Sequence, residues 1–106
     1  AMPGMATEAQ IEALLAAEGT EIDRLFYELM TPHHLGGVHM AGTAGATAVD
    51  PNVRRVASTM ARNQRIEVKE YRMRSDVLGL PWTEPDPDLV ALADAAIAGL
   101  PTREER

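Results

Sequence analysis

The chain has 106 residues, of which 45% are hydrophobic and 25% charged, a composition typical of one folded domain with a modest core. The formal net charge of −6 argues against a nucleic-acid partner, because such a partner requires a basic surface. No apolar run approaches the roughly 18 residues that a membrane-spanning helix needs, and we see no signal-peptide pattern. The sequence contains no cysteine, so disulfides, zinc–thiolate sites and iron–sulfur clusters are excluded.

The first predicted element is a short helix over residues 7–17. Residues 1–6 are expected to be a flexible N-terminus, and Ala1 ahead of Met2 resembles a tag remnant, so we expect the chain to be part of a longer protein. Thr7, followed three residues later by Gln10, has the spacing of a capping box, which predicts the start of the helix.

The second predicted element is a long helix from about residue 21 to about residue 44, with Thr20 as its N-cap. Apolar residues recur along it at the helical period of 3.6. Pro32 cannot donate a backbone hydrogen bond, so it predicts a kink. Several glycines follow, each costing about 1 kcal/mol relative to alanine, so the alternative is a helix that frays after Met40.

The third predicted helix runs from Pro51 to about residue 77. Asp50 as N-cap and Pro51 at the first helical position are a strong start signal. Gln64 and Glu67 interrupt the middle of its apolar stripe, where a carboxylate needs a partner or a metal. An arginine of the same helix or His33 is the partner that we expect for Glu67 if no metal is bound.

The C-terminal part is predicted to be a proline-rich linker at 80–87 and a last helix starting at residue 88, followed by a charged tail within 88–106. The hairpin domain would then occupy residues 7–79. No stretch has the alternating pattern of a strand, so the predicted fold class is all-α.

The two long helices predict a dimer. At 1.5 Å per residue they would be on the order of 36 and 40 Å long, more than a compact domain of this size requires. Pairing their apolar faces with a second copy would complete a four-helix bundle, with the short terminal helices covering its ends.

All three histidines and two of the six methionines lie between residues 30 and 40. On a helix, Met30, His33 and Met40 share one stripe, His34 flanks it, and His39 points away. We therefore expect His33 to be more buried than His39. Imidazole binds zinc, copper, iron or nickel, whereas thioether sulfur favours Cu(I). The alternative is that these side chains only pack against a neighbouring helix.

The polar residues of the two long helices are predicted to converge. With the connection placed near Thr47, helix register alone brings His33 closer to Met60 than to Glu67, and His34 reaches Gln64 more easily than His33 does. The candidate metal ligands are His33, His34, Met30, Met40, Gln64 and Glu67.

This arrangement resembles the bacterial domain-of-unknown-function 305 family. The residues that carry the resemblance are Asp23, Phe26, Met30, His33, His34, Gly37 and Met40, then Gln64 and Glu67. The N-terminal segment from Met2 to Met5 and Gly19 also resemble the second repeat of two-repeat, exported members. Tyr71 departs from the family pattern, because a methionine commonly stands there, and this weakens the case for copper.

The resemblance implies a ferritin-like helical hairpin in secreted or lipid-anchored proteins, some of which bind copper outside the cytoplasm. It leads to the hypothesis of an extracytoplasmic metal-binding homodimer, with copper as the expected ion and no catalytic residue. The alternative is a non-catalytic structural or interaction dimer with a buried His/Gln/Glu network. A di-metal carboxylate enzyme is disfavoured, because Glu67 is followed at i+3 by Glu70 rather than by histidine.

Overall fold

The computed structural model describes residues 4–101, and every regular element within them is a helix. The helices are α1 (Glu8–Ala16), α2 (Thr20–Thr47), α3 (Pro51–Leu78) and α4 (Pro87–Ala98). The predicted all-α class is therefore confirmed. None of these four helices is both long and apolar enough to cross a lipid bilayer.

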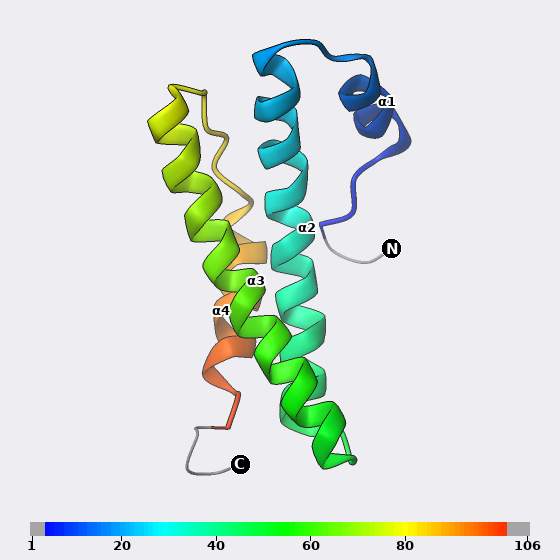
Figure 1. Ribbon diagram of the computed structural model, residues 1–106. Helices are drawn as coiled ribbons and strands as arrows, with labels where there is room; N and C mark the ends of the chain where they lie inside the picture. Colours follow the sequence, from blue (N-terminus) through cyan, green and yellow to red (C-terminus); the bar gives the residue numbers. More distant parts are fainter. Residues whose placement is uncertain (1–3, 102–106) are drawn as a thin grey trace.

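The fold is organised around an antiparallel hairpin of α2 and α3 (Figure 1). Helix α4 packs beside the C-terminal half of α2, and α1 stands apart near the N-terminal end of α2. The principal extents are 46 × 29 × 23 Å and the radius of gyration is 15.2 Å, above the roughly 13 Å of a compact chain of about 100 residues. The hairpin is thus elongated, and α4 lies along its side, not across its end as predicted.

Local sequence signals account for most helix ends. The Thr7–Gln10 capping box is present, with Thr7 N–Gln10 Oε1 at 2.7 Å and Gln10 N–Thr7 Oγ1 at 3.1 Å. Asp50 caps α3 by accepting a hydrogen bond from the backbone N–H of Val53 at 3.2 Å. The prediction of Thr20 as an N-cap was wrong, because Thr20 is already helical and Gly19 precedes it without a side-chain cap.

Helix α2 continues through its glycines to Thr47, so it does not fray after Met40. Tertiary contact explains why it tolerates them. A Cβ added at Gly42 would lie 2.7 Å from the Cβ of Ala96, and one added at Gly45 would lie 2.6 Å from the Oγ of Ser58. The glycines therefore let α3 and α4 approach the backbone of α2 more closely than any side chain would allow.

The core lies where α2, α3 and α4 meet. Leu35, Val38, Ala61 and Ala93 are completely buried there. The buried cluster as a whole consists of Leu35, Val38, Ala41, Ala61, Val68, Leu89, Ala93 and Leu100. Because Leu89, Ala93 and Leu100 belong to it, the segment after the proline-rich connection is part of the same core as the hairpin.

A second side of the hairpin stays open, and we call it the open face. Six apolar residues of α2 and α3 at helical spacing define it, and each is between 42% and 54% exposed. They are Ile22, Phe26, Met40, Val53, Val56 and Met60. The apolar stripe predicted for the long helices therefore lies largely on this face and not in the core of one chain.

Candidate functional site

A histidine, a glutamate and a tyrosine meet between the two long helices. The Nε2 atom of His34, on α2, lies 2.8 Å from Oε2 of Glu67 on α3. The same Nε2 lies 3.2 Å from the hydroxyl of Tyr71, which is 3.5 Å from the Glu67 carboxylate. His34 is 7% exposed, whereas the Glu67 side chain is 43% exposed. One polar partner is thus buried and the other reaches the surface.

The register of the hairpin explains this pairing. The connection between α2 and α3 lies at residues 48–50, later than the position near Thr47 used in the prediction. Each residue of α2 therefore faces a residue further along α3 than expected. His34 meets Glu67, and the backbone at Gly37 lies against the side chain of Gln64. The expected partners of Glu67, an arginine or His33, were wrong.

Aromatic side chains surround the tyrosine. The ring of Tyr71 lies 5.1 Å from that of Tyr27, 6.2 Å from that of Phe26 and 5.2 Å from that of His34. Burial among these groups, followed by the negative charge of Glu67, raises the pKa of the Tyr71 phenol above its ordinary value. The phenol is therefore protonated at neutral pH and available as a hydrogen-bond donor.

A small hollow of about 120 Å³ opens beside this cluster on the open face, and we call it the methionine hollow. Gln64 and Met60 of α3 form one wall. Met5, from the segment ahead of α1, also contributes to the lining. The complete lining is Met5, His33, Gly36, Gly37, Met40, Met60 and Gln64.

Gly37 is needed for the shape of the methionine hollow. A Cβ at this position would lie 2.5 Å from Oε1 of Gln64, which is closer than real Cβ atoms come. That Oε1 atom is buried and has no hydrogen-bond partner among residues 4–101. The absence of a side chain at Gly37 thus leaves room for a carbonyl oxygen that is free to accept a donor or a cation.

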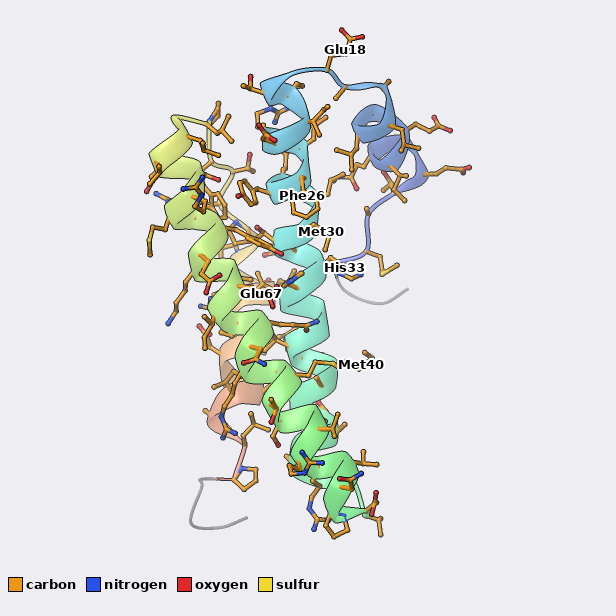
Figure 2. All side chains as sticks on the ribbon, viewed as in Figure 1. Glu18, Phe26, Met30, His33, Met40 and Glu67 are labelled. Carbon is orange, nitrogen blue, oxygen red and sulfur yellow. The ribbon has the colours of Figure 1, made fainter. Side chains whose placement is uncertain are left out.

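Five of the six predicted ligands are divided between two places. His34 and Glu67 bond to each other, while His33, Met40 and Gln64 line the methionine hollow. Met30 is partly buried and does not line it. Figure 2 shows Phe26, Met30, His33 and Met40 in succession along α2, with Glu67 on the neighbouring α3.

The predicted burial of the histidines was wrong. His33 is exposed and His39 is partly buried, because α2 turns the flank of its apolar stripe, not the centre, towards α3 and α4. His34 occupies the buried position instead. His33 is thereby left on the open face, where it lines the methionine hollow.

Two sulfur-bearing residues of the methionine hollow were absent from the predicted ligand set. Helix register had already placed Met60 close to His33, so this position could have identified it. Met5 had no local signal of this kind. The segment that carries it is held close to α2, where a Cβ at Gly4 would lie 1.9 Å from the carbonyl oxygen of Pro32.

The donor atoms around the methionine hollow indicate which ion it could hold. No cluster of three or more His, Cys, Asp or Glu side chains suited to a metal ion occurs within residues 4–101. The methionine hollow offers thioether, imidazole and amide oxygen donors, a set that fits a soft cation better than a hard one. His34 is bonded to Glu67 and Tyr71 and not to a serine or cysteine nucleophile.

The fold and the site together define an all-α hairpin protein with a polar cross-helix pair and a methionine-lined hollow. The chain belongs to the family described as "Domain of unknown function (DUF305)", which matches residues 1–74. No curated protein and no solved structure matches the chain. The family match ends within α3, so α4 and the connection before it lie beyond the matched residues.

Proposed function

We propose that this chain is an extracytoplasmic metal-binding protein that binds copper as Cu(I), secreted or attached to a lipid anchor, and acts as a buffer or carrier. The observation that carries the proposal is the gathering of Met5, Met40 and Met60 around one hollow with His33. Thioether sulfur is a ligand that favours Cu(I), and imidazole is compatible with it.

The composition supports the same proposal. Thiolates are the other common Cu(I) ligands, and they are lost to disulfides in oxidising compartments. A chain with six methionines, three histidines and no cysteine can hold the ion without thiols. This donor set suits a protein that works outside the cytoplasm.

The structure also narrows the proposed ligand set. His34 and Glu67 are bonded to each other, so they support the metal proposal less than His33 does. The ligands that we propose are His33, Met40 and Met60, with Met5 and Gln64 beside them. Met30 is left out, because it does not line the methionine hollow.

An anaerobic titration with Cu(I), in competition with a chromogenic chelator, tests this function. Wild-type protein should bind Cu(I) in a saturable way and prefer it to Zn²⁺. The double variant Met40→Leu/Met60→Leu keeps side-chain volume but removes two sulfurs, and should weaken binding by about tenfold or more. Met73→Leu is the matched control, because Met73 is 63% exposed and lies outside the hollow. Wild-type protein that takes up no Cu(I) would refute the proposal.

A second candidate function is a non-catalytic structural or interaction dimer, as the sequence also suggested. The bonded His34–Glu67–Tyr71 group favours it, because a satisfied polar network fixes the packing of the hairpin without a metal. The open face supplies apolar area for a second copy, and its six residues come from both long helices. The exposed apolar residues of α1, Ile11 and Leu15, also lack cover within one chain.

A further inference from the structure

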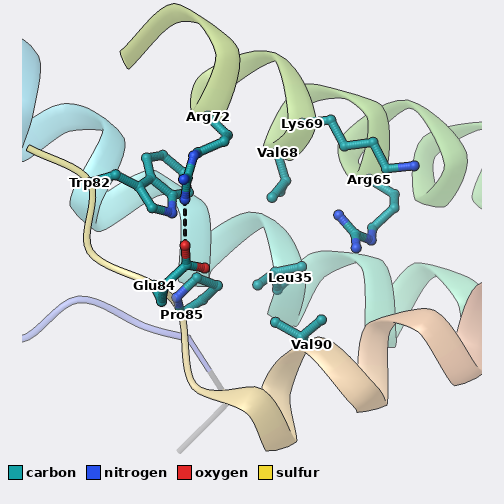
Figure 3. A pocket seen from close by; sticks show the side chains of 9 residues that line it. All are labelled: Leu35, Arg65, Val68, Lys69, Arg72, Trp82, Glu84, Pro85 and Val90. Carbon is teal, nitrogen blue, oxygen red and sulfur yellow. Dashed lines mark hydrogen bonds and ion pairs between the residues drawn. The ribbon is translucent and has the colours of Figure 1, made fainter. Parts of the chain in front are cut away.

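A separate hollow of about 270 Å³ lies on the side of the hairpin that carries α4 (Figure 3). It is bounded by α3, by the connection between α3 and α4, and by the start of α4. Trp82, Glu84, Pro85 and Val90 supply one wall, and all of them lie beyond the residues that match the family. This hollow is therefore built by the part of the chain that the family does not describe.

The floor of this hollow is apolar. Leu35 of α2 is completely buried, Val68 of α3 is 6% exposed, and Val90 of α4 packs against the same core. Figure 3 shows Leu35 and Val90 at the bottom, with Trp82 and Pro85 on the side of the connecting segment. An apolar body in the hollow would cover the accessible parts of Val68 and Val90, because Leu35 has no exposed surface of its own.

The rim is basic. Arg65, Lys69 and Arg72 follow one another on α3 at spacings of four and three residues, so they share one side of the helix. Glu84 is the single acidic residue of the lining. Two carboxylates outside the lining also pair with these cations, Asp94 with Arg65 and Asp76 with Arg72. Lys69 is therefore the cation of the rim whose charge no carboxylate within residues 4–101 balances.

Two of the three cations have donors to spare. Arg65 donates through Nε to Asp94 at 2.7 Å, and its terminal nitrogens have no other protein partner within residues 4–101. Lys69 forms no ion pair with any residue of that range, although it lines the hollow. By contrast, Arg72 is paired with Glu84, and its guanidinium carbon lies 5.4 Å from the centre of the Trp82 ring. Arg72 is thus part of the wall, and Arg65 and Lys69 are left to bind an anion.

We propose that this hollow binds a small organic carboxylate with an apolar body, such as a short acyl carboxylate. The carboxylate would accept hydrogen bonds from Arg65 and Lys69, and the apolar body would lie on Val68 and Val90. Inorganic phosphate would use only the rim and leave the apolar floor empty. The volume is below the roughly 300–1,000 Å³ of sites for drug-sized molecules, which favours a compact ligand.

Trp82 is the only tryptophan of the chain and lines the hollow, so its fluorescence reports binding directly. The full chain would be titrated with hexanoate, with hexanol as the uncharged counterpart, and with inorganic phosphate. Hexanoate should give a saturable change in the Trp82 emission, with hexanol and phosphate each binding at least about tenfold more weakly. Amide NMR shifts at Val68 and Val90 should saturate at the same hexanoate concentration.

Lys69→Gln and Arg65→Gln should each weaken hexanoate binding by about tenfold. The matched control is Arg74→Gln, which removes an exposed arginine of α3 that does not line the hollow. The proposal is overturned if hexanoate gives no saturable change, if hexanol binds equally well, or if Arg74→Gln has the same effect as Lys69→Gln. Equal binding of phosphate and hexanoate would also overturn it, by indicating an adventitious ion only.

Discussion

The hairpin has a closed side and an open face that are built from different kinds of residue. On the closed side, Gly42 and Gly45 bring α2 into backbone contact distance of its neighbours, and Leu35 and Val38 are completely buried. On the open face the side chains are larger, and methionine and valine remain about half exposed. The comparison indicates that the closed side supplies the stability of one chain, while the open face is available for a ligand or a second copy.

The packing of the closed side should be disrupted by a larger side chain at a position that has no free space around it. Gly42→Leu should lower the free energy of unfolding by about 3 kcal/mol, because even its Cβ would lie 2.7 Å from the Cβ of Ala96 and 3.2 Å from its backbone. Urea denaturation measures the change. Gly99→Ala is the control and should be nearly neutral, since its Cβ would meet nothing closer than 3.6 Å. Equal stability of Gly42→Leu and wild type would contradict the assigned packing of α4.

The hydrogen-bonded pair of His34 and Glu67, which joins α2 to α3, is expected to contribute less to stability than the packing at Gly42. His34→Ala removes the bonds to Glu67 and Tyr71, and should cost about 2 kcal/mol of stability. His39→Ala removes a partly buried ring whose nitrogens have no hydrogen-bond partner within residues 4–101, and should cost less. Thermal unfolding distinguishes the two variants. If His34→Ala abolished Cu(I) binding without loss of stability, His34 would be a ligand and not a packing residue.

Self-association through the open face can be tested by introducing a charged side chain there. Val56→Glu should weaken self-association by about tenfold while leaving the fold intact, because Val56 is already 46% exposed in one chain. Light scattering over micromolar concentrations gives the mass. Ile66→Glu is the control, since Ile66 is 52% exposed but lies about 120° around the helix from Met60. A monomer mass for wild-type protein at every concentration would remove the dimer from consideration.

The smallest effect concerns Tyr71. Its pKa is raised in the folded chain, so folding holds the phenol proton more tightly than the unfolded chain does. The corresponding stability is complete below the ordinary value of 10.0 and is lost as pH rises through the higher folded pKa. Between about pH 8 and about pH 11, the urea midpoint of Tyr71→Phe should therefore fall less than that of wild type. An identical fall in both proteins would show that Tyr71 contributes nothing to the pH dependence.

Much of the fold could be predicted from local sequence. The Thr7–Gln10 box and the Asp50–Pro51 start signal fix helix ends through hydrogen bonds between residues that are close in the chain. The helical periodicity of the two long segments gave the all-α class for the same reason. Thr20 failed as a cap because the chain enters α2 through Gly19 at a φ of 61°, where the side chain of Thr20 is already part of the helix.

The candidate site was predicted only in part. His34 and Glu67 meet, in agreement with the prediction that polar residues of the two long helices converge. His33 and Met30 do not join them. Periodicity shows that His33, Phe26 and Met40 share a stripe, yet it cannot say whether α3 packs on the middle of that stripe or on its flank. Because the connection lies at residues 48–50 and not near Thr47, each residue of α2 also lies opposite a different residue of α3 than predicted.

By itself, the sequence determined the four helices and which residues share a side of each, because backbone hydrogen bonding and side-chain period are local properties. The tertiary structure alone decided that His34 and not His33 is buried, that Met5 reaches the methionine hollow, and that α4 forms a basic, apolar-floored hollow with α3. These outcomes depend on contacts between distant segments, where the packing of small residues such as Gly42 and Gly45 sets how closely and on which side two helices meet.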